Sequence, residues 1–297
     1  MTTPSQESLE TGNVVFASSI QPSWNYSQEQ ITSAAISENG NYIIVGSRDS
    51  CLLTLFEKDS NEPLWTTNLS EEIWSVDISS TGESIVVATK DSAMYYFEKD
   101  SSIPIWQYNS TVHDPTSTTQ SMRVKISQNG EYIALGKQSN AELKGVFLFH
   151  KDSSVPLWHA NSSNGIPNEN VVSLEVSNDG GRIAASNSAQ IYFYTRDSPT
   201  PFHMDYSAGS PGTGIQMKYS PDGTRLYSNC DTYPDAICIF NGTSDFPIWK
   251  YNDTSMDVGA ISLSPDGYYL AVAWNKHYNQ GDYTDTRLTI FDTNTME

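Results

Sequence analysis

The 297-residue sequence contains no long hydrophobic run, and its first residues do not have the pattern of a secretory leader. No apolar stretch approaches the roughly 20 residues that a membrane-spanning helix needs. Residues Met1–Ser8 lack the basic and apolar regions of a signal peptide. These features are expected of an intracellular protein or of a mature or trimmed form, and both interpretations stay open.

Basic residues are scarce. The chain has 16 Lys plus Arg against 35 Asp plus Glu, which gives a formal net charge of -19. A field of this sign repels nucleic acid phosphates and anionic lipid. We therefore expect neither a nucleic acid partner nor an anionic membrane surface.

Cysteine is also scarce, and three cysteines define no disulfide framework. Cys230 and Cys238 flank a short loop, so a disulfide across one hairpin is conceivable. Two buried free thiols are the commoner arrangement, and the sequence favours that alternative.

Local motifs of catalysis and metal binding are missing. No two of the five histidines have metal-ligand spacing. There is no Gly-x-Ser-x-Gly elbow and no phosphate-cradling glycine-rich loop. Asn279, Asp282 and Asp285 could offer oxygen ligands to Ca²⁺, although their spacing does not match an EF-hand loop. We expect no catalytic residues, no metal and no cofactor, with Ca²⁺ kept as the one alternative.

What the sequence has in abundance is internal repetition, which determines the architecture before any single residue is interpreted. In Leu52–Trp65, an apolar strand ends in an aromatic residue, and a polar turn, a proline and a tryptophan follow. The same phrase returns in Tyr95–Trp106, Phe147–Trp158 and Ile239–Trp249. A weaker copy, Tyr194–His203, keeps the spacing but ends in histidine.

A second repeated phrase lies upstream of each copy of the first. It consists of alternating apolar residues, a turn that ends in glycine, and a β-branched and aromatic run, as in Ala35–Ser47. This is the pattern of a β-hairpin. Six such glycines are separated by 42, 48, 50, 43 and 44 residues. Each repeat thus predicts four short antiparallel strands, named a to d, and a period of about 40–50 residues indicates a propeller blade.

On these motifs the chain resembles WD-repeat and quinoprotein-like β-propellers over nearly its whole length. The Ser-Pro-Asp-Gly turns at Ser220–Gly223 and Ser264–Gly267 match the a–b turn of WD repeats, while the Gly-His and Trp-Asp signatures are absent. The second half of each repeat is similar to the tryptophan-docking motif of quinoprotein blades. The combination also resembles propellers in archaeal cell-surface proteins.

We predict an all-β, six-bladed propeller of four-stranded antiparallel blades over residues 13–297, preceded by an N-terminal extension at 1–12. The sixth copy stops at its strand c, Leu288–Asp292, and Gln21–Trp24 reads as a strand d without a blade. Simple closure puts this segment beside Ile290 and leaves no unpaired sheet edge. Asn13–Phe16 fits a further strand c, so seven blades is the alternative.

Two sets of residues are expected to hold the blades together. The repeated tryptophans could form a carbohydrate-stacking array, but their fixed place in the repeat predicts burial between blades; they are Trp65, Trp106, Trp158 and Trp249. On the innermost strand a, four successive blades carry alternating charges, at Asp77, Lys125, Glu175 and Lys218. Because isolated buried charges are costly, we expect these four residues to form a partial ring of alternating ion pairs. The alternative is four independent side chains that face channel water.

The connections divide between two faces. The a–b and c–d turns are short and uniform, whereas the b–c and d–a loops vary, and function usually resides on variable loops. The candidate partner-binding residues on those loops are His113, Asp114, Asp231, Tyr233, Asp235, His277, Tyr278, Asp282 and Tyr283. Candidate glycosylation sites are Asn25, Asn68, Asn109, Asn161, Asn241 and Asn252. Four of these follow a Trp-x-x-Asn pattern, although Asn also simply suits turns.

The sequence therefore predicts a non-enzymatic binding or structural module that uses the variable face, at a cell surface, with a protein or glycan partner. A quinoprotein-like or lyase-type propeller enzyme is one alternative, and a visible absorption spectrum would discriminate it. An intracellular, cytoplasmic WD-repeat-like scaffold is the other.

Overall fold

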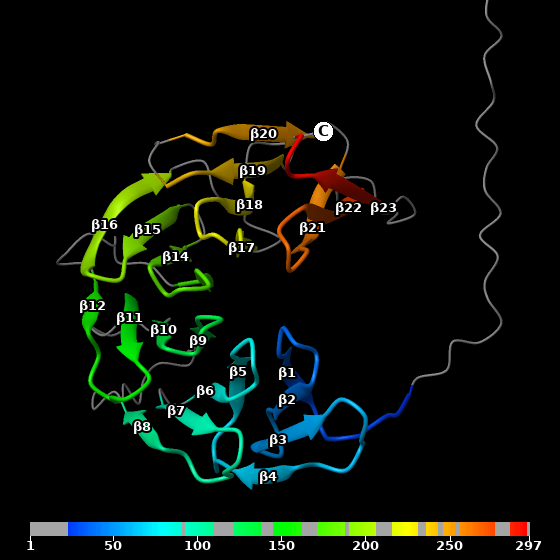
Figure 1. The fold of residues 1–297 in the computed structure, drawn as a ribbon, viewed down its shortest axis with the longest axis vertical. Coiled ribbons are helices and arrows are strands. Elements are labelled where there is room, and N and C mark those ends of the chain that lie inside the picture. Colours follow the sequence, from blue (N-terminus) through cyan, green and yellow to red (C-terminus); the bar gives the residue numbers. More distant parts are fainter. Residues whose placement is uncertain are drawn as a thin grey trace, which may run out of the picture.

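The computed structural model describes residues 23–90, 93–109, 122–137, 145–161, 171–187, 190–205, 216–230, 236–242, 246–253, 256–276 and 286–295. All regular secondary structure in these ranges is β-strand, arranged as six antiparallel sheets around a common centre (Figure 1). The described ranges contain no helix, and hence none of the length and apolarity that crossing a membrane requires. The predicted all-β propeller architecture is confirmed.

Five sheets have four strands in chain order, with the first strand nearest the centre and the fourth outermost (Figure 1). They comprise β1 (Ile31–Ile36), β2 (Tyr42–Ser47), β3 (Leu52–Glu57) and β4 (Trp65–Asn68); β5 (Ile73–Ile78), β6 (Ser84–Thr89), β7 (Ala93–Glu98) and β8 (Trp106–Asn109); β9 (Met122–Ile126), β10 (Tyr132–Lys137), β11 (Gly145–His150) and β12 (Trp158–Ala160); β13 (Ser173–Val176), β14 (Arg182–Ser186), β15 (Ile191–Thr195) and β16 (Ser198–Asp205); and β17 (Met217–Tyr219), β18 (Leu226–Cys230), β19 (Ala236–Phe240) and β20 (Trp249–Asn252). The sixth sheet has three strands among the described residues, β21 (Met256–Leu263), β22 (Tyr269–Lys276) and β23 (Thr286–Asp292).

Five of the six a–b turns share one hydrogen-bond pattern, which explains the repeated Ser-x-Asn/Asp-Gly phrase, and the second turn has Thr81 at the Asn/Asp position. In the fourth sheet, the Ser177 hydroxyl donates to Asp179 Oδ1 at 2.7 Å, and the backbone N–H of Arg182 donates to Ser177 Oγ at 2.9 Å. Gly180 has a φ of 70°, a left-handed conformation that favours glycine. A polar side chain thus satisfies the backbone of each turn before the chain enters the second strand.

The hydrophobic core lies between adjacent sheets. Between the first two sheets, Leu53 and Leu55 of β3 form a buried cluster with Ile73, Val76 and Phe97 of the second sheet. The other described junctions have equivalent clusters. Because the strands are apolar on both faces, each of the second to fifth sheets contributes to two clusters, one with each neighbour, whereas the first and the sixth contribute to one each.

The repeated tryptophans fasten each sheet to the next. Trp65 Nε1 donates a hydrogen bond to the carbonyl oxygen of Lys99 at 2.6 Å, and its ring stacks on Phe97 with centroids 5.8 Å apart. Equivalent bonds join Trp106 to Lys151 at 2.5 Å and Trp158 to Arg196 at 2.7 Å. The indoles are therefore committed to packing and are not arranged as an open stacking surface.

In the weaker copy of the phrase, Tyr194–His203, the side chain that packs at the junction with the next sheet is not that of the terminal histidine. Phe202, one residue before His203, lies 6.1 Å from Phe193 of its own sheet and beside Gly242 of the fifth sheet. A register shift between β15 and β16, at Phe193/Thr195, accompanies this change. A phenyl ring thus occupies the junction where the other copies have an indole.

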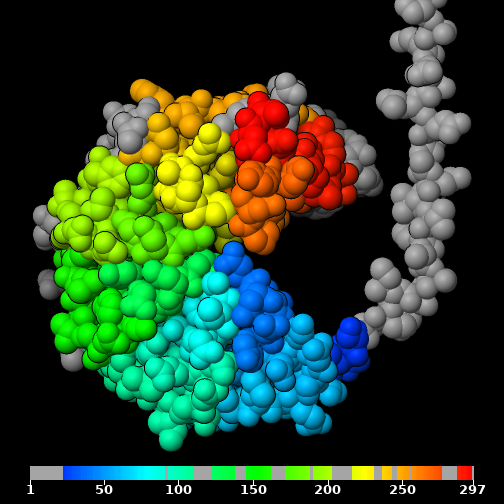
Figure 2. Space-filling view, in the orientation of Figure 1, coloured from blue at the N-terminus to red at the C-terminus, as the bar shows by residue number. Residues whose placement is uncertain are grey.

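The predicted closure of the ring is not present among the described residues. Trp24 Nε1 donates to the carbonyl oxygen of Lys58 at 2.6 Å, and the Trp24 ring lies 5.5 Å from Phe56. This segment therefore packs on the first sheet, and Ile290 of β23 is exposed. Figure 2 shows the described ring open between the first sheet (blue) and the sixth (orange to red).

Candidate interaction face

The nine candidate partner-binding residues, at 113–114, 231–235 and 277–283, all lie outside the described residues. The structure does describe the strand ends from which their b–c loops leave. Cys230 pairs with Ala236 at the base of residues 231–235, and Asn275 pairs with Thr286 below residues 277–285. Lys137 pairs with Gly145 at the base of a third long loop, residues 138–144. These three loops therefore arise from paired strands whose register the sheets fix.

One of these loop bases is cross-linked. Cys230 and Cys238 form a disulfide between β18 and β19, with their Cα atoms 5.8 Å apart. The expectation of two free thiols is therefore wrong. The spacing of eight residues did not decide the matter, because it suits either state; the antiparallel pairing of the two strands brings the Cβ atoms within reach. The third cysteine, Cys51, is free.

The described part of the same face, at the first two sheets, carries a network of ion pairs. Arg48 Nε lies 2.7 Å and Lys90 Nζ 2.6 Å from the Glu72 carboxylate. The hydrogen bond from Lys90, and then that from Arg48, hold the pKa of Glu72 below its usual range. The Arg48 guanidinium also lies 5.3 Å from the Trp74 ring centroid. These charges bind one another and stabilise the connections between the two sheets.

The sixth sheet has a similar ion pair where its third strand begins. Arg287 Nη2 lies 2.6 Å from Asp253 Oδ2, and its guanidinium is 5.6 Å from the centroid of the buried Trp274 ring. This pair ties the d–a connection of the fifth sheet to β23. On the variable face, ion pairs thus join connections of neighbouring sheets both at the first two sheets and at the last two.

Three candidate glycosylation sites occupy one structural position. Asn68, Asn109 and Asn252 are the last residues of β4, β8 and β20, and all are exposed. Asn161 directly follows β12 and is half-buried. The remaining two differ: Asn25 is exposed beside the first sheet, and the half-buried Asn241 follows β19 on the opposite, c–d side.

Near the axis, the four alternating charges lie in two close pairs, and among these described residues no ion pair joins Lys125 to Glu175 to continue the expected partial ring. Lys125 Nζ is 3.6 Å from Asp77 Oδ1, and Lys218 Nζ is 3.3 Å from Glu175 Oε1. The Asp77 carboxylate, and more weakly Glu175, raise the pKa of Lys125. Asp77 also accepts a hydrogen bond from the backbone N–H of Ile126 at 3.0 Å. Each pair joins one acidic and one basic side chain, so the four charges balance one another.

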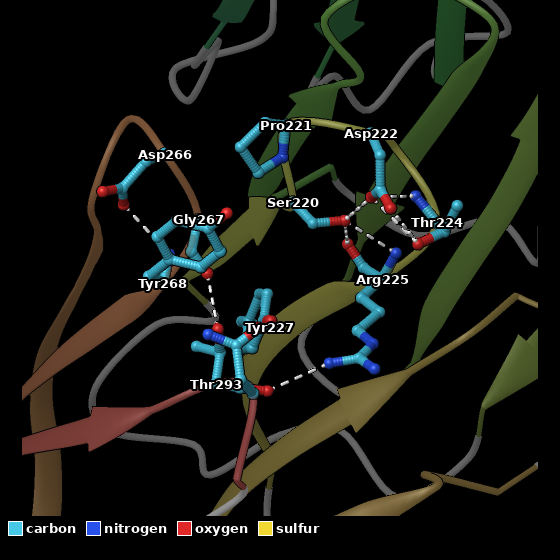
Figure 3. Close-up of a pocket in the computed structure, with 11 residues that line it drawn as sticks. Ser220, Pro221, Asp222, Thr224, Arg225, Tyr227, Asp266, Gly267, Tyr268 and Thr293 are labelled. Carbon is cyan, nitrogen blue, oxygen red and sulfur yellow. Dashed lines mark hydrogen bonds between the residues drawn. The ribbon is translucent and has the colours of Figure 1, made fainter.

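A cavity that the sequence did not predict opens on the uniform-turn face, between the fifth and sixth sheets (Figure 3). Its volume is about 290 Å³. Arg225 crosses the junction and donates to the carbonyl oxygen of Thr293 at 3.1 Å. The carboxylates of Asp222 and Asp266 accept hydrogen bonds within their own turns, which lowers the pKa of each. The polar groups of this cavity are therefore engaged in structure.

The described part of the chain offers no candidate group of metal ligands. Those residues contain no group of three or more His, Cys, Asp and Glu side chains that could hold a metal ion. The candidate Ca²⁺ ligands Asn279, Asp282 and Asp285 lie outside the described residues.

The sheets and their arrangement around a common centre define a β-propeller. Residues 21–53 match the family model described as WD domain, G-beta repeat. Among solved structures, the chain is similar to the β-propeller domain of Cps50 (Swd1) from Myceliophteria thermophila, with a TM-score of 0.66, 12% sequence identity, and 92% of this chain and 85% of that chain covered. No curated protein matches. These findings support the WD-repeat part of the resemblance, and the structural likeness shows the fold alone.

Proposed function

We propose that this chain is a non-enzymatic interaction module that binds a protein partner, or a glycan on such a partner, through its b–c and d–a loops. WD-repeat propellers as a class are scaffolds for protein interaction, and the family match at residues 21–53 supports that assignment. The residues that contact the partner are the candidates already named on the loops at 113–114, 231–235 and 277–283.

The observation that carries this proposal is the contrast between the two faces. The a–b turns repeat one hydrogen-bond pattern from sheet to sheet, as in Ser37–Asn39 and Ser220–Asp222. The b–c loops instead differ in length and sequence, and they start from strand ends in fixed register. A rigid scaffold with variable loops on one side is the usual architecture of a binding surface.

The proposal extends to the cell surface. The disulfide between Cys230 and Cys238 supports this location, because disulfides persist in oxidising compartments and are rare in the cytosol. The exposed sequons at the ends of three strands, at Asn68, Asn109 and Asn252, support it as well. Intact-mass measurement on protein from its native source tests the second argument directly: mass in excess of the polypeptide at these residues is expected.

The binding proposal is tested with a matched pair of variants used as bait in extracts from the native source. In the loop variant, residues 277–285 are replaced by a Gly-Ser linker of equal length. In the control variant, Ile103 and Val155, which are exposed on the c–d turns, are both changed to serine. We expect the control to retain the partners of the native chain and the loop variant to lose them. Retention by the loop variant together with loss by the control would place binding on the opposite face.

A further inference from the structure

The sixth sheet has an uncovered apolar face at the open side of the ring. Leu288 and Ile290 of β23 are 68% and 54% exposed. Their counterparts on β3, Leu53 and Leu55, are fully buried, because they pack on the next sheet. Tyr269, at the start of β22, is exposed as well, whereas its counterpart Tyr42 is half-buried.

The first sheet has an uncovered apolar residue on the other side of the opening. Ile36 of β1 is 60% exposed. The residue at the same place in the next three sheets is buried against the preceding sheet; these residues are Ile78, Ile126 and Val176. The first and the sixth sheet therefore each lack a neighbouring sheet at the opening of the described ring (Figure 2).

One strand position of such a neighbouring sheet is already filled. Trp24 bonds to the Lys58 carbonyl in the way that Trp65 bonds to that of Lys99. Tyr26 lies edge-on to Phe56 at 4.7 Å, as Tyr108 lies edge-on to Phe149 at 4.9 Å. Residues 24–26 thus stand where the outermost strand of a preceding sheet stands at the other junctions.

We propose that Asn13–Phe16 pairs with residues 24–27 as an antiparallel hairpin, which docks in the opening and covers Leu288 and Ile290. Every described outermost strand is paired with a strand c that precedes it and ends in an aromatic residue; for Trp65 and Trp106 these residues are Phe56 and Phe97. Phe16 precedes Trp24 by eight residues, close to the nine of those copies.

The packing of the described junctions shows which surface this strand would cover. Phe97, at the end of its strand c, lies in one buried cluster with Leu53 and Leu55 of the preceding sheet. By the same geometry, Phe16 would lie on Leu288 and Ile290. The occupant is a segment of this chain because the described residues begin at 23, next to Trp24 on the first sheet, so residues 13–16 are close in sequence to the opening. Val14 and Phe16 also supply apolar side chains to pack on Leu288 and Ile290.

Thiol labelling tests the proposal. Ile290→Cys and, separately, Ile103→Cys are made in a Cys51→Ser background, and the rate of reaction with a maleimide is measured on the monomer from gel filtration. Ile103 is a freely exposed reference side chain on a c–d turn. We expect Cys at 290 to react at least about tenfold more slowly than Cys at 103, since local opening must precede labelling. Adding Phe16→Ser should abolish this difference, and Glu10→Gln should leave it unchanged.

Two results would overturn the proposal. Equal labelling of the two cysteines in the full chain would show that nothing covers β23. Protection of position 290 that persists with Phe16→Ser, or that disappears on dilution, would assign the cover to another segment or to a second copy. Because the readout is accessibility, it is independent of partner binding at the b–c loops.

Discussion

The guanidinium of Arg196 lies 4.8 Å from the ring centroid of Tyr132, across the junction between the third and fourth sheets. Lys99 lies 5.4 Å from the ring of Tyr42 at the corresponding place between the first and second sheets. At the last two described junctions the basic residue lies on the preceding sheet instead of the following one. Arg182 and Arg225 occupy the place of the tyrosines and donate to the carbonyl oxygens of Asn241 and Thr293. A basic side chain therefore crosses each of these four junctions, through a cation–π contact at two of them and through a hydrogen bond to a backbone carbonyl at the other two.

Removing this contact should weaken one junction. Arg196→Met is expected to lower the free energy of unfolding by about 0.5–1 kcal/mol, the range for an exposed cation–π pair. In a Tyr132→Leu background the same change should cost less. A double-mutant cycle measured by chemical denaturation gives the coupling energy, and strictly additive effects would refute the interaction.

The indoles should contribute more to stability than any single ion pair. Trp65→Ala is expected to cost about 3–5 kcal/mol, because it removes a large aromatic side chain from between two sheets. Trp65→Phe keeps most of the ring and loses the bond to the Lys99 carbonyl, so it should cost about 1–2 kcal/mol. Thermal melts of the two variants check both values. An unchanged melting temperature for Trp65→Ala would contradict the assigned role.

Two turn glycines offer a comparison that separates backbone strain from packing. Gly40 and Gly180 have φ values of 71° and 70°, so alanine meets the same backbone strain at each. A methyl group at position 40 would meet nothing within 4 Å, whereas at position 180 it would collide with the ring of Tyr132. We expect Gly180→Ala to be the more destabilising by about 1–3 kcal/mol. Equal losses in urea denaturation would show that the sheets can move apart there without cost.

Acid should weaken the turns that contain aspartate. Hydrogen bonds from the Gly181 N–H and the Ser177 hydroxyl lower the pKa of Asp179, and bonds within their own turns lower those of Asp222 and Asp266. A carboxyl group whose pKa is lower in the folded state stabilises the fold above its unfolded pKa, near 4, and loses this contribution as the pH falls through the folded pKa.

The natural turns with Asn39 and Asn129 make the same hydrogen bonds without a titrating group. A variant with asparagine at positions 179, 222 and 266 should therefore lose less unfolding free energy than the native chain between about pH 6 and pH 3. Urea titrations at each pH provide the measurement. Parallel pH curves for the two proteins would contradict this account.

The disulfide should stabilise the base of the 231–235 loop. Changing Cys230 and Cys238 together to serine is expected to cost about 2–3 kcal/mol, the value for a short closed loop. Cys51→Ser, which alters the free thiol, serves as the control and should have little effect. Identical denaturation midpoints for the native and the doubly substituted proteins, both under non-reducing conditions, would indicate that the bond does not form.

The sequence was most informative where a pattern repeats. The spacing of the glycines and of residues such as Trp65 and Trp106 predicted the strands, their order and the inter-sheet position of the indoles, because each repeat must bury both faces of its sheet. The alternation of Asp77 and Lys125 predicted a close pair, because isolated charges on the innermost strands would be costly. These features depend on local geometry that every copy shares.

Features that occur once were not predictable in this way. The place of Trp24 on the first sheet depends on the angle between neighbouring sheets, which packed side chains set and no single repeat encodes. The state of Cys230 and Cys238 depends on the register of two strands. The contact of Arg225, which stands at the position equivalent to Tyr132, could not be predicted either, because its partner is the backbone carbonyl of Thr293 in the next sheet.

The most direct test of the interaction face is hydrogen–deuterium exchange of the chain with and without the partner captured from its native source. Binding through the variable loops predicts slower exchange in peptides that cover residues 137–145, 230–236 and 276–286. Peptides that cover the c–d turns at residues 57–64, 98–105 and 150–157 should exchange at the same rate in both states. Protection confined to those turns, with the loops unchanged, would contradict the account.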